Sequence, residues 1–411
     1  MGKMDVGRSK EKIIMDVAGP FLISSKEQRA EYMHIHPNIR KMPNGRLILS
    51  INKDRDIHDS EFFTLMSDNL GKTWKETDDH WPIAKYPGAG TSFNINDEDV
   101  LASLSYSFES EKKGTYILPT WFSRNGGNTW GEMQACQVEI PHVEPVDIYN
   151  SLDRERLKAK INGPAEAKDG FFKTAPPANL QVLFEKFSKK RAPGISTMIK
   201  ISDDHILGLV TLRCGADEQC SVAVVESKDK GHSWQFVTIA ARFRESYIDK
   251  AYRRPDGSIR KVDGFCEPSM IRFDDGELLM MLRMGSYYPL YEIRSKDNGR
   301  SWSKPKKSSI TGILPRLVKM QNGIVALAAG RPNITVNFSL DRGHSWKYQI
   351  KIFESSGVNT STCNTDMIEL ENRLLLFYDL GNEDKNIKDT WLRYHQNSKI
   401  IAYSIGVDIL Y

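Results

Sequence analysis

The sequence has few cysteines, and their arrangement would neither staple a small fold nor hold a metal. There are five cysteines, an odd number, and none forms a C-x-x-C pair. This argues against a disulfide scaffold and against a zinc site of the usual spacing. Cys214 and Cys220 flank a predicted hairpin tip and could face each other across two strands, but we interpret them as buried free thiols. No metal or other cofactor is expected.

The sequence also lacks a long hydrophobic run. No stretch reaches the roughly 18 apolar residues of a membrane span. The segment from Met1 to Lys12 is polar and charged, without the hydrophobic region of a signal peptide. We therefore expect a soluble chain without a membrane span. A removed export signal would leave no trace, so the compartment stays open, with a secreted or periplasmic location among the options.

A strong excess of one charge is absent as well. The formal net charge is +4 over 411 residues, and the basic residues are spread along the chain rather than clustered. Nucleic acid is therefore not an expected partner. Hydrophobic residues make up 40% of the chain, which is enough for a large core.

What the sequence does contain is one turn pattern, S-x-[DN]-x-G-x-[ST]-W, repeated five times. The copies, called boxes below, start at Ser67, Ser123, Ser227, Ser295 and Ser339. Each follows a strand-like run. The Ser and Asp or Asn side chains can hydrogen-bond nearby backbone groups, the Gly tolerates positive φ, and the Trp can cap the adjoining core. The boxes are therefore predicted to be hairpin turns that support a repeated fold.

Around the boxes the sequence predicts repeated groups of four short strands. A strand from Ile13 to Ile23 precedes the first group and is expected to join the last one, which closes a ring and hides its sheet edges. We predict an all-β, six-bladed β-propeller of four-stranded antiparallel blades, in a single domain over residues 1–411. The six units run from His36 to Trp74, Ser92 to Trp130, Ser196 to Trp234, Glu267 to Trp302, Leu314 to Trp346 and Asn364 to Ile405.

The second and third boxes are much further apart than the fourth and fifth, which indicates an insertion at about residues 141–193. Within it, Asp153 to Lys160 and Pro177 to Lys190 have helical character. We predict one or two short helices between the second and third blades. The insertion either packs on the propeller and extends the rim of a cleft, or is a solvated excursion.

The box, its recurrence and the count of six units resemble the sialidase (neuraminidase) superfamily, whose Asp-box or BNR repeats build a six-bladed propeller. The resemblance covers nearly the whole chain. It implies an active site at the central axis, on the inner strands and their loops, whereas the boxes lie on the outside. Function must therefore be argued from residues at the axis.

The resemblance implies an acid/base aspartate eleven positions ahead of the first box, which corresponds to Asp56. Asp54 and Asp59 lie in the same polar loop and are alternatives. A glycosidase needs such a carboxyl group to protonate the leaving oxygen. The distance between the carboxyl groups of Asp56 and Glu267, a glutamate described in the next paragraph, would distinguish a retaining mechanism from an inverting one.

The fourth unit begins with Glu267, and its next predicted strand ends in Arg283. These positions resemble the family's inner-strand glutamate and one of its substrate-binding arginines; the fifth unit places Arg331 at the position of another. The resemblance implies that Glu267 acts as nucleophile or as base for a water, while both arginines grip a sugar carboxylate. Alternatively, Glu267 and Arg283 form a purely structural ion pair.

The sequence departs from the family at two positions. The family's first carboxylate-binding arginine, in an R-I-P pattern, is replaced in Ile35-His36-Pro37, with His34 and Arg40 nearby. The nucleophilic tyrosine is replaced by Asn364, or by Cys363 in an alternative register. Because an asparagine amide is not a competent nucleophile, His36 and Asn364 are assigned to substrate binding.

Three functions are consistent with these residues. The first is a sialidase-like glycoside hydrolase, exo-acting on an anionic sugar such as a sialic-acid-like or uronic residue, with Asp56 as acid. The second is a polysaccharide lyase in which His34 and His36 act on a uronic acid. The third is a noncatalytic glycan-binding propeller. The expected partner is a carbohydrate in each case, and the sequence leaves the sugar, the linkage and the oligomeric state open.

Overall fold

The structure is a computed structural model that describes residues 12–25, 27–29, 34–52, 62–77, 81–85, 90–141, 191–214, 219–248, 262–354, 364–381 and 397–410. Within these ranges the chain is built from short strands, and the helical segments are two short 3-10 turns, η1 (Pro82–Lys85) and η2 (Glu245–Tyr247). The predicted all-β class is confirmed. No helix in the described part is long and apolar enough to cross a membrane.

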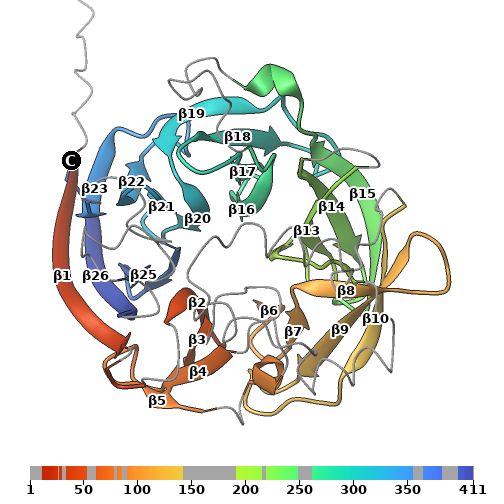
Figure 1. Cartoon of the computed structure of the whole chain (residues 1–411), viewed down its shortest axis with the longest axis horizontal. Helices are drawn as coiled ribbons and strands as arrows, with labels where there is room; N and C mark the ends of the chain where they lie inside the picture. The colour runs from red at the N-terminus through yellow and green to blue at the C-terminus, as the bar shows by residue number, and fades with distance from the viewer. Residues whose placement is uncertain are drawn as a thin grey trace, which may run out of the picture.

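The strands form sheets arranged in a ring around a central axis (Figure 1). Three of the sheets have four consecutive strands that follow one another from the axis outward. The first contains β2 (Ile35–Lys41), β3 (Leu47–Asn52), β4 (Phe62–Ser67) and β5 (Lys75–Glu76). The second contains β16 (Cys266–Arg272), β17 (Leu278–Arg283), β18 (Pro289–Ser295) and β19 (Lys306–Thr311). The third contains β20 (Ile313–Lys319), β21 (Val325–Gly330), β22 (Ile334–Ser339) and β23 (Tyr348–Phe353).

The fourth four-stranded sheet joins the two ends of the described chain. It contains β24 (Thr365–Leu370), β25 (Arg373–Leu380), β26 (Lys399–Leu410) and β1 (Lys12–Ser25). Strand β1 runs antiparallel to β26 along nearly its whole length, from Lys12 opposite Leu410 to Ser25 opposite Lys399. The predicted closure of the ring by the early strand is confirmed, and Figure 1 shows the two long strands side by side on the outside.

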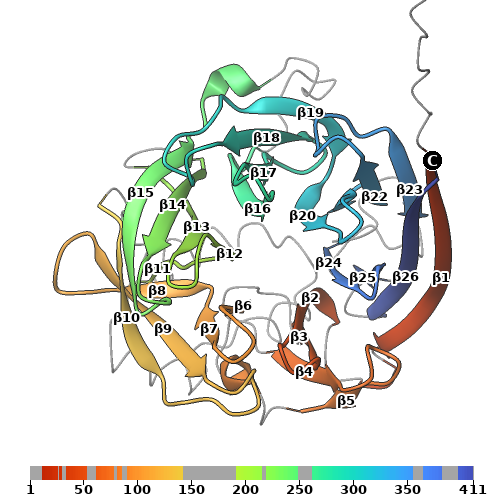
Figure 2. The same cartoon turned by 180° about the vertical axis from the view of Figure 1, so that it is seen from behind.

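The remaining strands belong to one ten-stranded sheet. One part contains β6 (Gly90–Asn94), β7 (Val100–Leu104), β9 (Thr115–Ser123) and β10 (Gln134–Glu139), with β8 (Tyr106–Glu109) and β11 (Arg191–Pro193) at its side. The other contains β12 (Thr197–Lys200), β13 (Ile206–Leu212), β14 (Ser221–Ser227) and β15 (Ser233–Ala241). A short parallel pairing of β10 with β15 joins the two parts. The view from behind shows the same closed arrangement (Figure 2).

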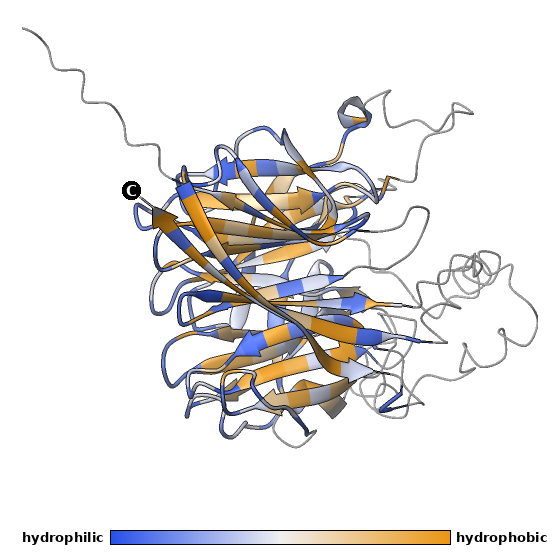
Figure 3. Cartoon of the chain, turned by 90° about the vertical axis from the view of Figure 1, so that its left-hand side faces the viewer, coloured by the Kyte–Doolittle hydropathy of each residue, from blue (hydrophilic) through white to orange (hydrophobic). Residues whose placement is uncertain are grey.

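The hydrophobic core lies between neighbouring sheets. Leu49 of β3 clusters with Phe377 of β25, and Leu279 of β17 clusters with Leu327 of β21; all four are fully buried. Middle strands are therefore apolar on both faces, as in the wholly buried β4, whereas the outer β23 alternates. Figure 3 shows hydrophobic residues along the strands and hydrophilic residues at the turns. Burial of both faces explains why the middle strands read as continuous apolar runs.

Each box forms the predicted turn, between the third and the outermost strand of its group. In the first box the Ser67 hydroxyl donates to Asn69 Oδ1 at 2.9 Å and accepts from the Gly71 amide at 2.9 Å. The Thr73 amide donates to Asn69 Oδ1, and this hydrogen bond completes the turn. Equivalent Ser-to-Asp or Asn and Gly-to-Ser bonds recur in the other four boxes. The repeated sequence therefore encodes a repeated side-chain hydrogen-bond network.

The box glycines also hold neighbouring sheets together. A Cβ placed on Gly343 would lie 2.6 Å from Leu279 Cδ2, which belongs to the preceding sheet. The other four box glycines face the preceding group in the same way, through Leu375, Met42, Leu101 and Leu207. The absence of a side chain at the box glycine thus permits close approach of adjacent sheets.

Most of the predicted insertion, residues 142–190, lies outside the described residues, and so do both predicted helices. Its last residues return to the ring as β11, which pairs antiparallel with β8. Cys214 and Cys220 do not form a disulfide with each other; Cys214 is buried, as interpreted from the sequence, whereas Cys220 is partly exposed.

Candidate active site

Three inner strands begin with the same backbone irregularity. In β2, β16 and β20 the register with the second strand shifts near the first residue, and a proline follows the displaced position. The displaced residues are His36, Glu267 and Leu314, with φ of 54°, 47° and 44°. Positive φ is costly for residues with a Cβ, on the order of 1–3 kcal/mol each, and such strain clusters at functional sites. A bulge of this kind re-aims a side chain at the end of a strand.

These strand starts lie at one end of the ring. The Leu314 amide donates to Glu267 Oε2 at 2.9 Å, and further along the same strands the Leu317 amide donates to Ser269 Oγ at 2.9 Å. The order of the contacts shows that β16 and β20 run in the same direction. Contacts from β20 to β24 follow the same order, from Arg316 with Asp366 to Gln321 with Glu369. Residues at the starts of these strands therefore share one end of the axis.

Glu267 lies in an ion pair with Arg283. Arg283 Nη1 donates to Glu267 Oε1, and the Leu314 amide occupies Oε2, so each carboxylate oxygen accepts a hydrogen bond. The two side chains are 28% and 13% exposed, which leaves the glutamate accessible while the arginine is largely buried. The Glu267–Arg283 ion pair, which the sequence analysis gave as the alternative to substrate binding, is present.

A second carboxylate and a serine complete the surroundings of Arg283. Arg283 Nη2 donates to Asp263 Oδ2 at 2.9 Å and approaches Ser286 Oγ at 3.5 Å. Arg331 Nη1 donates to the same Ser286 oxygen at 2.8 Å, although Arg331 follows β21 in the neighbouring sheet. One serine thus bridges the two arginines assigned to sugar binding. Arg331, with φ of 47°, repeats the strained backbone of the strand starts.

The carboxylates around Arg283 affect the pKa values of this arginine and of the neighbouring Cys266. Burial alone would lower the pKa of Arg283, but the nearby Glu267 and Asp263 carboxylates, with Cys266, raise it above its ordinary value. Burial raises the pKa of the Cys266 thiol well above its usual range, and the adjacent Glu267 charge adds to the effect. Arg283 therefore stays cationic at neutral pH, and Cys266 stays a neutral thiol.

A second group of polar side chains joins the first sheet to the closing sheet. Asp379 of β25 is fully buried, and its Oδ2 accepts from the His36 amide at 2.9 Å and from Asn364 Nδ2 at 2.7 Å. Its Oδ1 accepts from the Asn364 amide at 3.1 Å. The side-chain nitrogen of Asn364, Nδ2, also lies 3.3 Å from His36 Nε2. The two residues that depart from the family are thus held together by one buried carboxylate.

A further ion cluster lies deeper along the same inner strands. Asp366 of β24 accepts from Arg316 Nε at 2.7 Å and from Arg40 Nη1 at 3.0 Å. It also accepts from the Ile39 amide at 2.9 Å. Because the three donor residues belong to β20 and β2, this carboxylate ties together three sheets around the axis.

The structure brings the predicted residues together in part. Glu267, Arg283 and Arg331 meet in one cluster, and His36 and Asn364 meet in the other. His34 is fully buried and packs edge-on against Phe63, with ring centroids 5.4 Å apart. Asp54, Asp56, Asp59 and Cys363 lie outside the described residues. Within the described ranges, no group of three His, Cys, Asp or Glu side chains could hold a metal ion.

Three polar residues of the clusters were missed in the sequence: Asp263, Ser286 and Asp379. Asp263 and Ser286 stand in loops that flank the apolar strands of the fourth unit, and Asp379 follows a five-residue apolar run. A charged residue that ends an apolar strand was the signal that identified Arg283. The same signal at Asp379 would have identified the buried carboxylate.

The comparisons with known proteins agree with the fold. Residues 206–367 match the BNR repeat-like domain. The resemblance to BNR-repeat proteins is confirmed. No curated protein matches the chain.

Solved structures with propeller-like folds match nearly the whole chain. A protein of unknown function from Dyadobacter fermentans has a TM-score of 0.62 at 16% identity, covering 96% of this chain and 99% of the other. A Hadza microbial sialidase has a TM-score of 0.55 at 14% identity, with 92% and 66% covered. A Penicillium chrysogenum α-L-arabinanase, complexed with arabinobiose, has a TM-score of 0.54 at 12% identity, with 94% and 98% covered. At such identities the likeness establishes the fold alone.

Proposed function

We propose that this BNR-repeat chain is a glycoside hydrolase whose active site lies at the axial end that carries Glu267. If the two parts of the ten-stranded sheet count as separate blades, the ring has six four-stranded blades in a single domain. The site then takes its residues from the first, fourth, fifth and sixth blades. Catalytic sites assembled at the end of an axis from several sheets are a recurrent use of such folds.

The observation that carries the proposal is the contact chain from Glu267 through Arg283 and Ser286 to Arg331. It joins a partly exposed carboxylate to two guanidinium groups from neighbouring sheets. An arginine fork can hold a sugar carboxylate through two parallel hydrogen bonds. The arrangement therefore favours an anionic sugar, such as a sialic-acid-like or uronic residue at the end of a glycan.

The environment of Glu267 suits a base or a nucleophile. Hydrogen bonds from Arg283 and from the Leu314 amide hold both of its carboxylate oxygens in place at the axis. In the proposed reaction Asp56 donates a proton to the glycosidic oxygen as the bond to the anomeric carbon breaks. Glu267 either attacks that carbon, to be displaced later by water, or takes a proton from the water that attacks it. Asn364 and His36 bind sugar hydroxyls and take no part in covalent chemistry.

A noncatalytic glycan-binding role is the second candidate. It is favoured by one feature: both oxygens of Glu267 already accept hydrogen bonds, as expected for a carboxylate that only positions Arg283. The two candidates differ in whether bound glycan is cleaved.

The proposal is tested with paired aryl glycosides that differ only in a carboxylate, such as glucuronide and glucoside, together with a sialoside and an arabinofuranoside. We expect turnover of an acidic member. Arg331→Ala should raise KM for the acidic substrate at least tenfold, because it removes one carboxylate donor. Arg272→Ala, on the same strand as Glu267 but at its far end, serves as control. Binding of acidic glycans without turnover of any glycoside would favour the noncatalytic role.

A further inference from the structure

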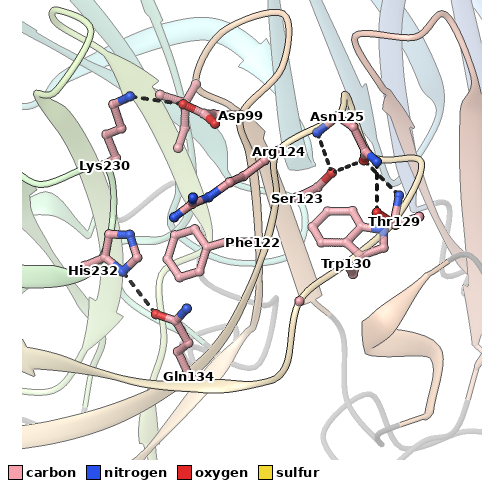
Figure 4. Close-up of a pocket in the computed structure, with 12 residues that line it drawn as sticks. Asp99, Phe122, Ser123, Arg124, Asn125, Thr129, Trp130, Gln134, Lys230 and His232 are labelled. Carbon is pink, nitrogen blue, oxygen red and sulfur yellow. Dashed lines mark hydrogen bonds and ion pairs between the residues drawn. The ribbon is translucent and has the colours of Figure 1, made fainter.

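A pocket of about 600 Å³ lies beside the second and third boxes (Figure 4). It lies where the group β6 to β10 meets the group β12 to β15, and none of the axial residues described above lines it. Its volume falls in the range of small-ligand sites.

Rigid rings form two of its walls. Phe122 of β9 stacks on His232 of the third box, with centroids 4.2 Å apart and planes 17° apart. Trp130 of the second box lines the pocket as well, and Trp81 holds it in an edge-on contact at 5.7 Å. Such rings offer broad contact area to a ring-shaped ligand at little cost in conformational entropy.

The pocket lining contains two basic side chains, Lys230 and Arg124, and one carboxylate, Asp99, so positive charge is in excess. Lys230 Nζ lies 3.0 Å from Asp99 Oδ2, and this hydrogen bond lowers the pKa of Asp99, to which the charge of Arg124 also contributes without a hydrogen bond. Arg124 has no hydrogen-bond or ion-pair partner among the residues that the structure describes. Figure 4 shows its side chain extending toward the space between Lys230 and His232, beside the Phe122 ring.

Two further polar side chains, His232 and Gln134, line the same space. His232 Nδ1 lies 3.1 Å from Gln134 Oε1, which fixes both side chains at the pocket wall. In the described part of the chain, neither His232 Nε2 nor Gln134 Nε2 has a further hydrogen-bond partner. Both nitrogens can therefore serve a ligand that carries hydroxyl groups.

We propose that this pocket is a second, noncatalytic site that binds an acidic sugar unit of a glycan. The carboxylate pairs with the Arg124 guanidinium, the sugar ring lies against the aromatic walls, and the hydroxyls meet His232 and Gln134. Lys230 already pairs with Asp99, so it would orient the ligand less than Arg124 would. This site goes beyond the proposed hydrolase, because it needs no chemistry at the axis.

The test is calorimetric titration with tri-galacturonate and with sialyllactose, each beside its neutral counterpart, methyl-esterified tri-galacturonate or lactose. An Arg331→Ala background weakens the axial site. In that background we expect one acidic probe to bind at least tenfold more tightly than its neutral counterpart. Adding Arg124→Ala should reduce this affinity at least tenfold. Adding Lys228→Ala should leave it unchanged, since that lysine belongs to the third box, is 63% exposed and does not line the pocket.

Three results would overturn the proposal: failure of both acidic probes to bind in the Arg331→Ala background, equal affinity for the neutral counterparts, or full affinity after Arg124→Ala. Because Arg124 is exposed, its replacement should leave the melting temperature unchanged, which separates loss of binding from loss of folding. The titration detects binding by its heat, so it does not require that the chain cleave any glycoside. A chain that cleaves no glycoside would therefore refute the proposed hydrolase without affecting this site.

Discussion

Asn364 is the residue that the resemblance to sialidases aligns with a nucleophilic tyrosine, with Cys363 as the alternative, and its surroundings show what an amide can do at this position. Its backbone and side-chain nitrogens both donate to the fully buried Asp379, and the same carboxylate accepts from the His36 amide. The side chain is thus held in one orientation by a carboxylate beneath it. Under the proposed function, a fixed amide contributes hydrogen bonds to a sugar and no covalent intermediate.

We therefore predict that Asn364→Ala weakens substrate binding by about 1–3 kcal/mol, the usual cost of losing a hydrogen bond to a buried polar group. In steady-state kinetics the loss should appear mainly in KM, with kcat changed by less than about tenfold. Asn322→Ala, in a turn at the far end of β20, is the control and should leave both constants unchanged. A kcat that falls to background would show that the amide takes part in the chemistry.

The axial residues also show where prediction from sequence succeeds at this level. Glu267 and Arg283 were predicted from their resemblance to the family's inner-strand glutamate and arginine, and each is also a charge at the boundary of an apolar run, which is costly without a partner. Ser286 and Asp263 gave no such signal, because polar residues in loops are ordinary. The strained backbone at His36 and Glu267 depends on register shifts between paired strands. Such shifts are set by pairing across the sheet, which local sequence does not encode.

The box turn is the element on which the fold prediction rested, and its glycine has two separable functions. Gly343 has φ of +82° and would place a Cβ 2.6 Å from the buried Leu279 of the preceding sheet. Gly323, in an ordinary hairpin, has φ of +85° and nothing within 4 Å. Gly323→Ala should cost about 1–2 kcal/mol through backbone strain alone. Gly343→Ala should cost a further ~1–3 kcal/mol through overpacking.

Urea unfolding of both variants measures this difference. Equal losses of unfolding free energy would mean that the box glycine serves only its own turn and does not set the spacing of the sheets.

The box carboxylates predict a pH dependence of stability. Burial alone would raise the pKa of Asp229, Asp297 and Asp341, but hydrogen bonds from the box serines outweigh it and hold each pKa below its ordinary value. The unfolded chain therefore binds more protons than the folded one. The stability from these groups is present above the unfolded pKa of about 4, and it is lost as pH falls through the folded value.

A variant with all three box aspartates changed to asparagine should accordingly lose less in melting temperature than the wild type between about pH 5 and pH 3. The first two boxes, which carry Asn69 and Asn125 naturally, show that the turn forms with an amide. Parallel melting curves for the two proteins across this range would contradict the assignment.

Among the elements, the repeated ones were the most predictable. The strands, the box turns and the closure by β1 follow from a pattern that recurs along the chain. The parallel pairing of β10 with β15 and the side pairing of β8 with β11 occur once each. No repeated sequence pattern therefore predicts them. The predicted helices of the insertion lie outside the described residues and stay predictions.

For the molecule as a whole, the ring is held at the axis by the Asp366 ion cluster. This carboxylate is 7% exposed and receives Arg316 from one neighbouring sheet and Arg40 from the other. Asp366→Ala would leave the largely buried Arg40 and the partly exposed Arg316 without their shared counterion. We predict a loss of about 3–5 kcal/mol in unfolding free energy, the usual cost of breaking a buried ion pair on one side.

The matched control is Asp408→Ala, an exposed aspartate on the outer strand β26, which should change stability by less than about 0.5 kcal/mol. Urea titration followed by tryptophan fluorescence gives both values. An Asp366→Ala protein as stable as its control would show that the sheets hold together without this cluster.

The proposed hydrolase depends on Glu267 as the axial carboxylate that either attacks the anomeric carbon or activates a water. The most direct test is kcat of Glu267→Gln, measured on whichever glycoside the wild type cleaves, beside Glu292→Gln, a buried glutamate in the third strand of the same sheet. The account predicts a fall in kcat of about 10³-fold or more for Glu267→Gln, with folding retained, and near wild-type kcat for Glu292→Gln. Full activity of Glu267→Gln would contradict it.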